Sequence, residues 1–222
     1  MTKFRWATCV FGMAAAGLTG CPLSNGLTPP ADCAPVDEAW MDSAPRCGSG
    51  SSYHTYNLPV GADCQVVDGD FEYSHARVTS VPEIAQYRAV TGSMTFFFAT
   101  NLSDISALRN IEHVGWLSFR GNPISDLRSL GSLRVVTNAL RIAEMPLLTS
   151  LEGLGQLRSV GGDLLIVGNQ ELTTLRGLDS LCRVGGTVRI YDNPLLPESE
   201  VQALLARITV GGEVIVMNPI GP

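Results

Sequence analysis

The chain has 222 residues, 45% of them hydrophobic and 16% charged, and its 15 basic and 21 acidic side chains give a formal charge of −6 at pH 7. Because nucleic acids are polyanions, this charge balance argues against a nucleic-acid partner. No stretch after residue 20 is long and apolar enough to span a bilayer.

The first 20 residues have the pattern of an export signal. Lys3 and Arg5 precede an apolar run at residues 7–18, ATCVFGMAAAGL, which is far shorter than a membrane span. The run ends at Leu18-Thr19-Gly20-Cys21, which resembles the lipobox of bacterial lipoproteins. The resemblance implies that residues 1–20 are a lipoprotein signal peptide and that Cys21 becomes the acylated first residue of the mature chain.

Lipidation at Cys21 would make the lipid bilayer a partner of the protein. It would place the protein in the bacterial cell envelope, lipid-anchored and either periplasmic or surface-facing. Because the signal contains two of the basic residues and none of the acidic ones, the mature chain would carry a formal charge of −8. The alternative is an ordinary secretory signal that is cleaved near Ala16 or Gly20, with Cys21 an incidental thiol.

Residues 21–62 are rich in Pro, Ser, Gly and Ala and have little periodic apolar content, which predicts a flexible tether between the lipid and a folded body. Four cysteines follow Cys21, an even number in an exported chain, so disulfides with three alternative pairings are plausible: Cys33, Cys47, Cys64 and Cys182. A Cys33–Cys47 bridge would close a loop within the tether.

A repeat of 23 to 26 residues follows the tether. Its register is set by two apolar residues two positions apart, the spacing of one face of a β-strand. Seven such pairs occur: Phe71 and Tyr73, Met94 and Phe96, Leu117 and Phe119, Leu140 and Ile142, Leu164 and Ile166, Val188 and Ile190, and Val214 and Val216. A fixed period of this size predicts repeat units that stack on one another and share one core.

Two further positions recur ahead of each pair. Glycine lies two positions before the pair in six units, with Asn138 in the fourth, and a glycine allows the backbone to turn sharply there. Valine lies four positions before the pair in six units, with His113 in the third. This placement favours a packed or edge histidine at residue 113 over a base or a metal ligand.

After each strand the apolar residues step by three. The runs are Leu102, Ile105, Leu108 and Ile111; Ile124, Leu127, Leu130 and Leu133; Leu148, Leu151, Leu154 and Leu157; and Leu172, Leu175, Leu178 and Leu181. Two apolar edges per unit indicate that the chain turns a corner around a common interior. Four asparagines that follow the strands are expected to bond turn backbone in adjacent units: Asn122, Asn169, Asn193 and Asn218.

Residues 197–208, PESEVQALLARI, predict one amphipathic helix packed on the last units. Pro stands first, acidic residues occupy the first turn, and the apolar residues keep helical spacing: Val201, Leu204, Leu205 and Ile208. The stretch EVIVM at residues 213–217 then predicts a closing strand.

Three segments resemble the receptor L domain, the leucine-rich-repeat-like module in the extracellular regions of insulin and EGF receptors: CQVVDGDFEY at 64–73, TGSMTFF at 91–97 and VGGDLLIVGNQELTTLRGL at 160–178. The resemblance implies an α/β fold over residues 63–222. This would be a right-handed leucine-rich-repeat-like β-solenoid of about seven coils of 23–26 residues, with one C-terminal capping helix.

The resemblance gives less information about function than about fold. The receptors place two L domains around a cysteine-rich module that this sequence lacks, so their hormone sites are not carried over. Cys64 matches the cysteine that opens the family's first strand. Its bridge would then go to Cys47, go to Cys182, or not exist.

The sequence offers no catalytic constellation, and we expect no enzymatic activity, cofactor or metal. Three histidines share no metal-ligand spacing: His54, His75 and His113. An acidic group lacks the order of an EF-hand loop: Asp63, Asp68, Asp70 and Glu72. Asp70 recurs as Asp163 after the turn glycine, which favours a structural role for both.

The alternate strand positions should point outward and form two columns. One column is Glu72, Thr95, Ser118, Arg141, Leu165, Arg189 and Ile215, and the other is Ser74, Phe97, Arg120, Ala143, Val167, Tyr191 and Met217. Apolar groups mixed with arginine and tyrosine are typical of recognition surfaces, so the candidate ligand-binding face is Phe97, Arg120, Arg141, Leu165, Val167, Arg189 and Tyr191. Alternatively the tether folds over this face, or the face is only a tolerated sheet surface.

These expectations combine into one functional hypothesis. The protein is a membrane-anchored lipoprotein that binds a protein or a glycan through the outward sheet face without catalysis. The alternative is a passive structural spacer of the cell envelope.

Overall fold

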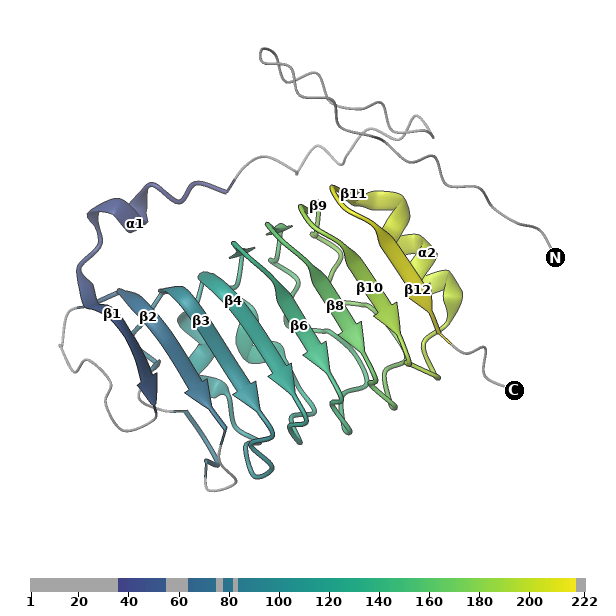
Figure 1. Cartoon of the computed structure of the whole chain (residues 1–222), viewed down its shortest axis with the longest axis horizontal. Helices are drawn as coiled ribbons and strands as arrows, with labels where there is room; N and C mark the ends of the chain where they lie inside the picture. Colours follow the sequence, from purple (N-terminus) through teal and green to yellow (C-terminus); the bar gives the residue numbers. More distant parts are fainter. Residues whose placement is uncertain (1–35, 55–63, 75–77, 82–83, 219–222) are drawn as a thin grey trace, which may run out of the picture.

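The computed structural model describes residues 36–54, 64–74, 78–81 and 84–218, with the side chains of all these except 48–54. Twelve strands form one sheet, and every strand pair in it is parallel. The helices are few and short, so the described chain is mostly parallel sheet, which confirms the expected α/β class at this coarse level. Figure 1 shows the strands following one another in chain order across the sheet.

The sheet divides into two ladders after its first strands. The long strands are β1 (Arg46–His54), β2 (Val66–Tyr73), β3 (Ala89–Phe97) and β4 (His113–Arg120). From β4 onward each unit supplies two short strands, the first set being β5 (Val135–Val136), β7 (Ser159–Val160), β9 (Arg183–Val184) and β11 (Thr209–Val210). The second set is β6 (Leu140–Ala143), β8 (Leu164–Val167), β10 (Val188–Tyr191) and β12 (Val214–Met217).

The corner between the two ladders is where the repeated glycines lie. A Cβ atom at Gly162, which belongs to the glycine column, would lie 2.6 Å from Asn138 O of the preceding unit, and one at the neighbouring Gly161 would collide with Thr137 O. The successive units therefore approach too closely here for a larger residue, which explains the glycine column.

The helices in the described part of the chain are α1 (Trp40–Ser43), η2 (Ser106–Asn110), η3 (Arg128–Leu130) and α2 (Glu198–Arg207).

The predicted register of the apolar pairs is confirmed residue by residue. The first members align across the sheet from Phe71 through Met94, Leu117, Leu140, Leu164 and Val188 to Val214. All are buried except Val214, which is 36% exposed because no described strand lies beyond β12. In the adjacent row, the rings of Tyr73, Phe96 and Phe119 stack with centroids 5.1 and 4.7 Å apart.

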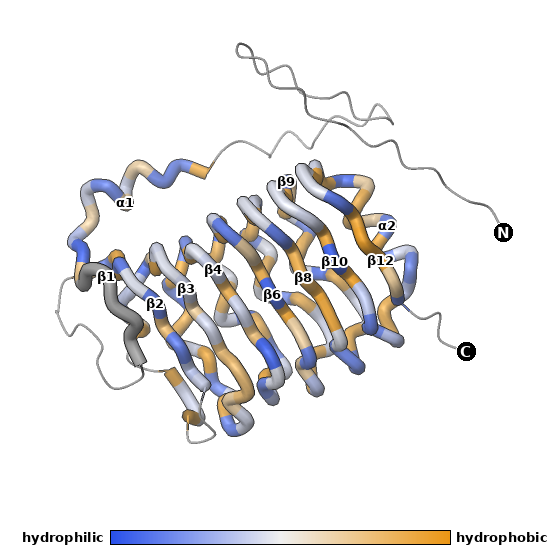
Figure 2. Tube along the Cα trace, in the orientation of Figure 1, coloured by the Kyte–Doolittle hydropathy of each residue, from blue (hydrophilic) through white to orange (hydrophobic). Residues whose placement is uncertain are grey.

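The runs that step by three form the opposite side of the same core, and every predicted member is buried. Their period has a simple cause: successive residues form turns with hydrogen bonds from residue i+3 to residue i. Leu154 N donates to Leu151 O at 3.1 Å and Leu157 N donates to Leu154 O at 2.9 Å. A three-residue turn brings every third side chain to one side, whereas the strand brings every second one. Figure 2 shows hydrophobic residues along β6, β8, β10 and β12 and hydrophilic ones at the loops beyond the strand ends.

Strands β3, β4, β6, β8 and β10 are each followed by a residue with left-handed backbone. The five positions are Phe98, Gly121, Glu144, Gly168 and Asp192, with φ between 47° and 69°. Each of their amides donates to a carbonyl of the following unit, as Glu144 N does to Val167 O at 2.9 Å. Only two of the five are glycine, so this recurrent corner has no residue-type signature in the sequence.

The expected asparagine bonds are present in the later units. Asn169 accepts from Met145 N at 3.1 Å and donates to Ile142 O at 3.1 Å, both in the preceding unit. Asn193 does the same toward Asn169 N at 3.0 Å and Ile166 O at 2.9 Å. These side chains are fully buried, so each one satisfies backbone groups that water does not reach.

Asn122 departs from this pattern. Its Oδ1 accepts from Arg120 N within its own unit at 3.1 Å. Its buried Nδ2 has no partner among the described residues. The expectation of a bond to the adjacent unit is therefore wrong for Asn122.

Helix α2 matches the predicted segment 197–208 to within one residue at each end. Val201 and Leu204 are buried in the common core. Glu200 accepts hydrogen bonds from Thr174 Oγ1 at 2.7 Å and Leu175 N at 3.0 Å, which fixes the helix against the preceding repeat unit. The same two bonds lower the pKa of the Glu200 carboxyl.

The predicted tether does not extend to residue 62. Residues 46–54 form β1, which pairs with β2 from Arg46↔Val66 to His54↔Glu72. The folded body therefore begins before residue 63. The segment looked unstructured because β1 is rich in Gly and Ser, yet a parallel ladder can form through the backbone alone.

A disulfide joins Cys47 on β1 to Cys64 just before β2. This is the first of the alternatives for Cys64, and it excludes a Cys33–Cys47 loop. Cys182 is disulfide-bonded as well. Cys21 and Cys33 lie outside the described residues.

His113 does not take the valine position of its unit. Val114 aligns with Val90 and Val136, while His113 aligns with Ala89 and Val135. The ladder between β3 and β4 shifts register after Val90, and counting positions in the sequence cannot reveal that shift.

Two adjacent residues of β8 test the inward and outward assignment. Ile166 is fully buried and Leu165 is partly exposed on the opposite side. We expect Ile166→Asp to lower the free energy of unfolding by about 4 kcal/mol or more, because the variant buries a carboxylate. Leu165→Asp should lower it by less than about 1 kcal/mol. Urea unfolding followed by circular dichroism measures both, and equal losses would contradict the assignment.

Candidate functional site

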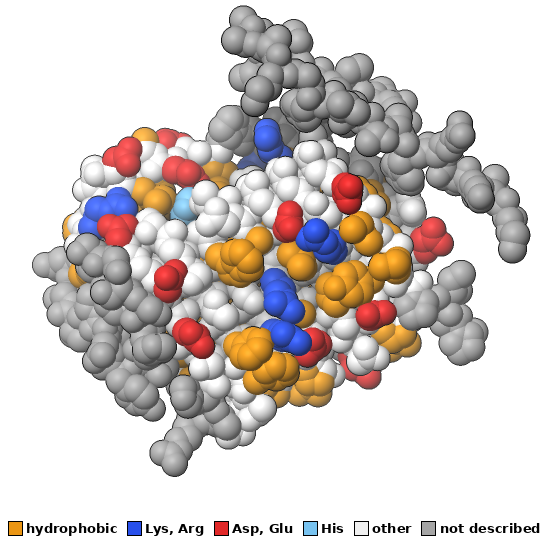
Figure 3. All heavy atoms as spheres, in the orientation of Figure 1, with side chains coloured by type: hydrophobic (Ala, Val, Ile, Leu, Met, Phe, Trp, Pro, Cys, Tyr) orange, Lys and Arg blue, Asp and Glu red, His pale blue; other side chains and the backbone are white. Residues whose placement is uncertain are grey.

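The two predicted outward columns are present in the sheet. Thr95, Ser118, Arg141, Leu165, Arg189 and Ile215 align across β3, β4, β6, β8, β10 and β12. Beside them align Phe97, Arg120, Ala143, Val167, Tyr191 and Met217. All seven candidate face residues therefore lie on one side of the sheet. Figure 3 views this side and shows hydrophobic and arginine side chains gathered over its middle.

Two members of the columns contribute little surface. Ser118 and Ala143 are buried, although they point to the outward side. Both are small and lie between larger neighbours on adjacent strands. The surface at these points is therefore made by the residues around them.

Two large aromatic side chains on or beside this face were missed by the sequence analysis. Trp116 on β4 is 42% exposed, and Phe98 just after β3 is 41% exposed. Trp116 lies one position before the inward Leu117, so extending the strand alternation by one residue would have found it. Phe98 has left-handed backbone, which the sequence does not indicate.

Arg120 is held by aromatic and acidic neighbours. Its guanidinium carbon lies 5.3 Å from the centre of the Phe97 ring and 5.2 Å from that of Phe98, within the range of cation–π contacts. It also forms an ion pair with Glu144 at 2.8 Å. Phe97 and Phe98 pack edge to face with centroids 4.6 Å apart. These four residues form a cluster at one end of the face in which the neighbours hold the Arg120 side chain in place.

Arg189 on β10 is paired with Asp163, the residue that precedes β8. Its Nη1 lies 2.7 Å from Asp163 Oδ2, and Thr187 N donates to Asp163 Oδ1 at 2.8 Å. The Thr187 amide and then Arg189 hold the pKa of the Asp163 carboxyl below its ordinary value. Asp70 makes the equivalent backbone bond, accepting from Ser93 N at 2.6 Å. The structural role expected for both aspartates is confirmed.

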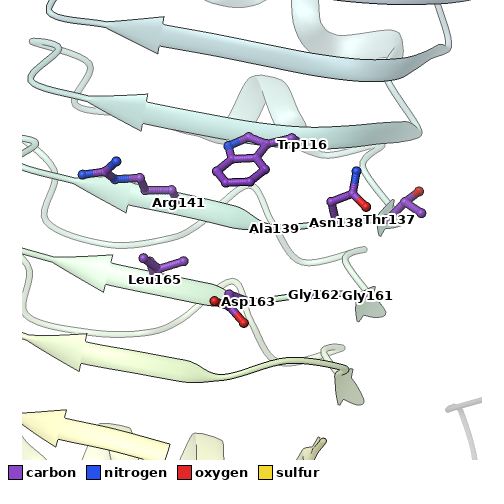
Figure 4. A pocket seen from close by; sticks show the side chains of 9 residues that line it. All are labelled: Trp116, Thr137, Asn138, Ala139, Arg141, Gly161, Gly162, Asp163 and Leu165. Carbon is purple, nitrogen blue, oxygen red and sulfur yellow. The ribbon is translucent and has the colours of Figure 1, made fainter. Parts of the chain in front are cut away.

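Unlike Arg120 and Arg189, Arg141 forms no ion pair among the described residues. It lines a shallow hollow of about 400 Å³ on the sheet surface. The other lining residues are Trp116, Thr137, Asn138, Ala139, Gly161, Gly162, Asp163 and Leu165. Figure 4 shows the Trp116 ring at one end of this hollow, with Arg141 and Leu165 side by side.

The described part of the predicted tether contacts the edge where the strands begin. Glu38 Oε1 lies 2.9 Å from His113 Nδ1, and the Arg88 guanidinium carbon lies 3.9 Å from the centre of the Trp40 ring. Thr137 Oγ1 lies 2.8 Å from the other ring nitrogen of His113, so this histidine is buried and bonded on both sides. These contacts place Glu38 and Trp40 at that edge of the sheet.

Asp68 and Asp70 of β2 bond to the neighbouring strands β1 and β3. Arg46 donates to Asp68 through Nε at 2.7 Å and through Nη2 at 2.6 Å. The hydrogen bond from the Arg46 guanidinium lowers the pKa of the Asp68 carboxyl. Among the described residues no group of three His, Cys, Asp or Glu side chains is placed to hold a metal ion.

Comparison with known proteins gave no match to a family model, to a curated protein or to a solved structure. None of the helices in the described part of the chain has the length and apolarity needed to cross a membrane. We therefore infer the function from the geometry of the sheet face.

The pair between Asp163 and Arg189 predicts a pH dependence of stability. Because folding lowers the pKa of Asp163, its ionised form stabilises the fold above its unfolded pKa of about 3.9. This contribution is lost as the pH falls through the lower folded pKa. We expect Asp163→Asn to be less stable than the parent at pH 7, with the difference shrinking below pH of about 4. Urea unfolding from pH 7 to pH 3 measures it, and a constant difference would contradict the assigned role.

Proposed function

We propose that this protein is a non-catalytic binding module that recognises a protein or a glycan through the outward sheet face. The observation that carries the proposal is the exposure of aromatic and aliphatic side chains among arginines on that face. Phe97, Trp116, Leu165, Val167 and Tyr191 all keep surface exposed to solvent on it, although the chain has an extensive buried core elsewhere. Aromatic residues and arginine are the side chains that most often dominate binding energy at interfaces.

The rigidity of the face supports the same proposal. Its residues stand on strands whose backbone groups are bonded to neighbours on both sides from β2 to β10. Arg120 is further fixed by the Phe97 and Phe98 rings and by Glu144. Side chains that are held before binding lose less conformational entropy when a partner arrives.

We infer that the sheet is one wall of a right-handed leucine-rich-repeat-like solenoid of about seven coils, of the receptor L-domain type. The support is the alignment of residues 23 to 26 positions apart on successive strands, together with the buried runs of period three on the other side of the core. Solenoids use such extended sheet faces as binding surfaces.

We also propose that acylation of Cys21 anchors the protein to the bilayer of a bacterial cell envelope. The support is the sequence alone: the charged start, the apolar run and the Leu18–Cys21 lipobox. The anchor would leave the residues between Cys21 and Asp37 to separate the sheet from the lipid.

A passive spacer of the envelope is the second candidate function. It is favoured by the ion pairs of Arg120 with Glu144 and of Arg189 with Asp163, which satisfy two arginines of the face within the chain. A spacer needs no partner at the sheet. Changes on its face would then alter nothing that the protein captures.

A double variant distinguishes these functions. Leu165→Asp with Tyr191→Asp places two carboxylates on the face without touching the core. We expect the full chain, immobilised from detergent extract, to capture envelope components that the double variant loses at least about tenfold, since each buried apolar contact contributes on the order of 1–2 kcal/mol. Quantitative mass spectrometry of the captured material measures the loss.

The matched control carries Leu147→Asp and Leu195→Asp, two exposed leucines outside the strands. This control should capture the same components as the parent. Equal capture by the parent, the double variant and the control would contradict the binding proposal and favour the spacer.

A further inference from the structure

The proposed function does not specify the chemistry of the ligand. The hollow beside Trp116 indicates which class of ligand fits the face. We propose that this hollow binds a sugar ring of an acidic glycan, with the ring against Trp116 and a carboxylate of the glycan on Arg141. The inference depends on the proposed function, because it assigns a ligand class to the same sheet face.

The hollow has an aromatic wall and a floor of small residues. Trp116 projects from β4 beside Ala139, the residue that precedes β6, and Gly161 and Gly162 lie at the corner before β8 (Figure 4). A Cβ atom at Gly162 would lie only 2.6 Å from Asn138 O, so the backbones of the two units are close together here. Small side chains beside a large exposed indole leave a flat recess, and a ring of about the same width can lie in it against the aromatic surface.

Arg141 supplies the charge. Arg120 and Arg189 are neutralised by Glu144 and Asp163, whereas Arg141 has no carboxylate partner among the described residues. Its side chain extends along β6 away from the Trp116 ring (Figure 4). An unpaired guanidinium at one end of a recess favours a ligand with a carboxylate some distance from the group that lies on the indole.

The polar groups around the recess suit a glycan better than a peptide. A peptide that binds by strand addition needs unpaired backbone N–H and C=O groups, and those of β4, β6 and β8 are bonded to neighbouring strands. The recess is also shallow and has no enclosed apolar chamber for a peptide side chain. It offers instead the exposed Asn138 amide, whose side chain makes no hydrogen bond among the described residues, as a donor and acceptor for hydroxyl groups.

Titration of the full chain with acidic trisaccharides tests the assignment. The probes are trisaccharides that contain galacturonic, glucuronic or sialic acid, with galactotriose as the neutral counterpart and hexaglutamate as an acidic peptide. We expect at least one acidic trisaccharide to bind at least about tenfold more tightly than galactotriose, because it adds a charge-assisted bond. Isothermal titration calorimetry at 20 mM and at 500 mM salt measures the affinities, and high salt should weaken this binding.

Two variants link the binding to the recess. Trp116→Ala should weaken binding of the acidic trisaccharide at least about tenfold, since it removes the aromatic wall. Arg141→Gln should abolish the preference for the acidic over the neutral trisaccharide. Matched controls away from the recess, Leu147→Ala and Arg134→Gln, should change neither affinity.

Three outcomes would overturn the inference. These are no binding of any acidic trisaccharide, tighter binding of hexaglutamate than of the saccharides, or binding that Trp116→Ala and Arg141→Gln leave unchanged. If the parent still captures envelope components that Leu165→Asp with Tyr191→Asp loses, the binding function stands without the glycan. If the parent captures no envelope component that the double variant loses, the proposed binding function is contradicted as well.

Discussion

The parallel backbone ladder is the constraint on which the rest of the molecule depends. It aligns residues that lie 23 to 26 positions apart in the chain, so that the apolar pair of every unit reaches the same side of the sheet. A shift of one residue in any strand would exchange its buried and exposed residues. The close contact at Gly161, the left-handed residues after the strands and the buried asparagines all hold the chain to this one register.

The same ladder shapes the proposed recognition surface. One side of the sheet is used by the common core, and the backbone groups between β2 and β10 are used by the neighbouring strands. The outward side of the sheet, where the side chains differ from unit to unit, stays open to a partner. Arg120 and Arg189 are paired with carboxylates, whereas Arg141 has no carboxylate partner in the described part of the chain, so the face combines fixed side chains with one available charge. This asymmetry is what turns a regular sheet into a candidate binding surface.

Much of the fold and of the outward face could be predicted because the repeat appears in the sequence as a regular spacing of side-chain types. The apolar pairs, the outward columns, the buried runs of period three and α2 each follow from a recurrent spacing. The remainder depends on features that spacing does not encode. Strand β1 has no apolar alternation, the shift after Val90 moves His113 out of the valine column, and the left-handed exits are occupied by residues as different as Phe98 and Gly168. Trp116 was predictable in principle, since it needed only one further step of the strand alternation.

Residue-resolved hydrogen exchange tests the ladder most directly. The amides of Leu117, Leu140, Leu164 and Val188 each donate to a carbonyl of the next unit at 2.9–3.0 Å, while no described strand lies beyond β12 to accept from Val214. We expect the first four to exchange together and at least about a thousandfold more slowly than Val214. Exchange of Leu164 and Val188 at the rate of Val214 would contradict it, because those residues would then not be paired in one continuous sheet.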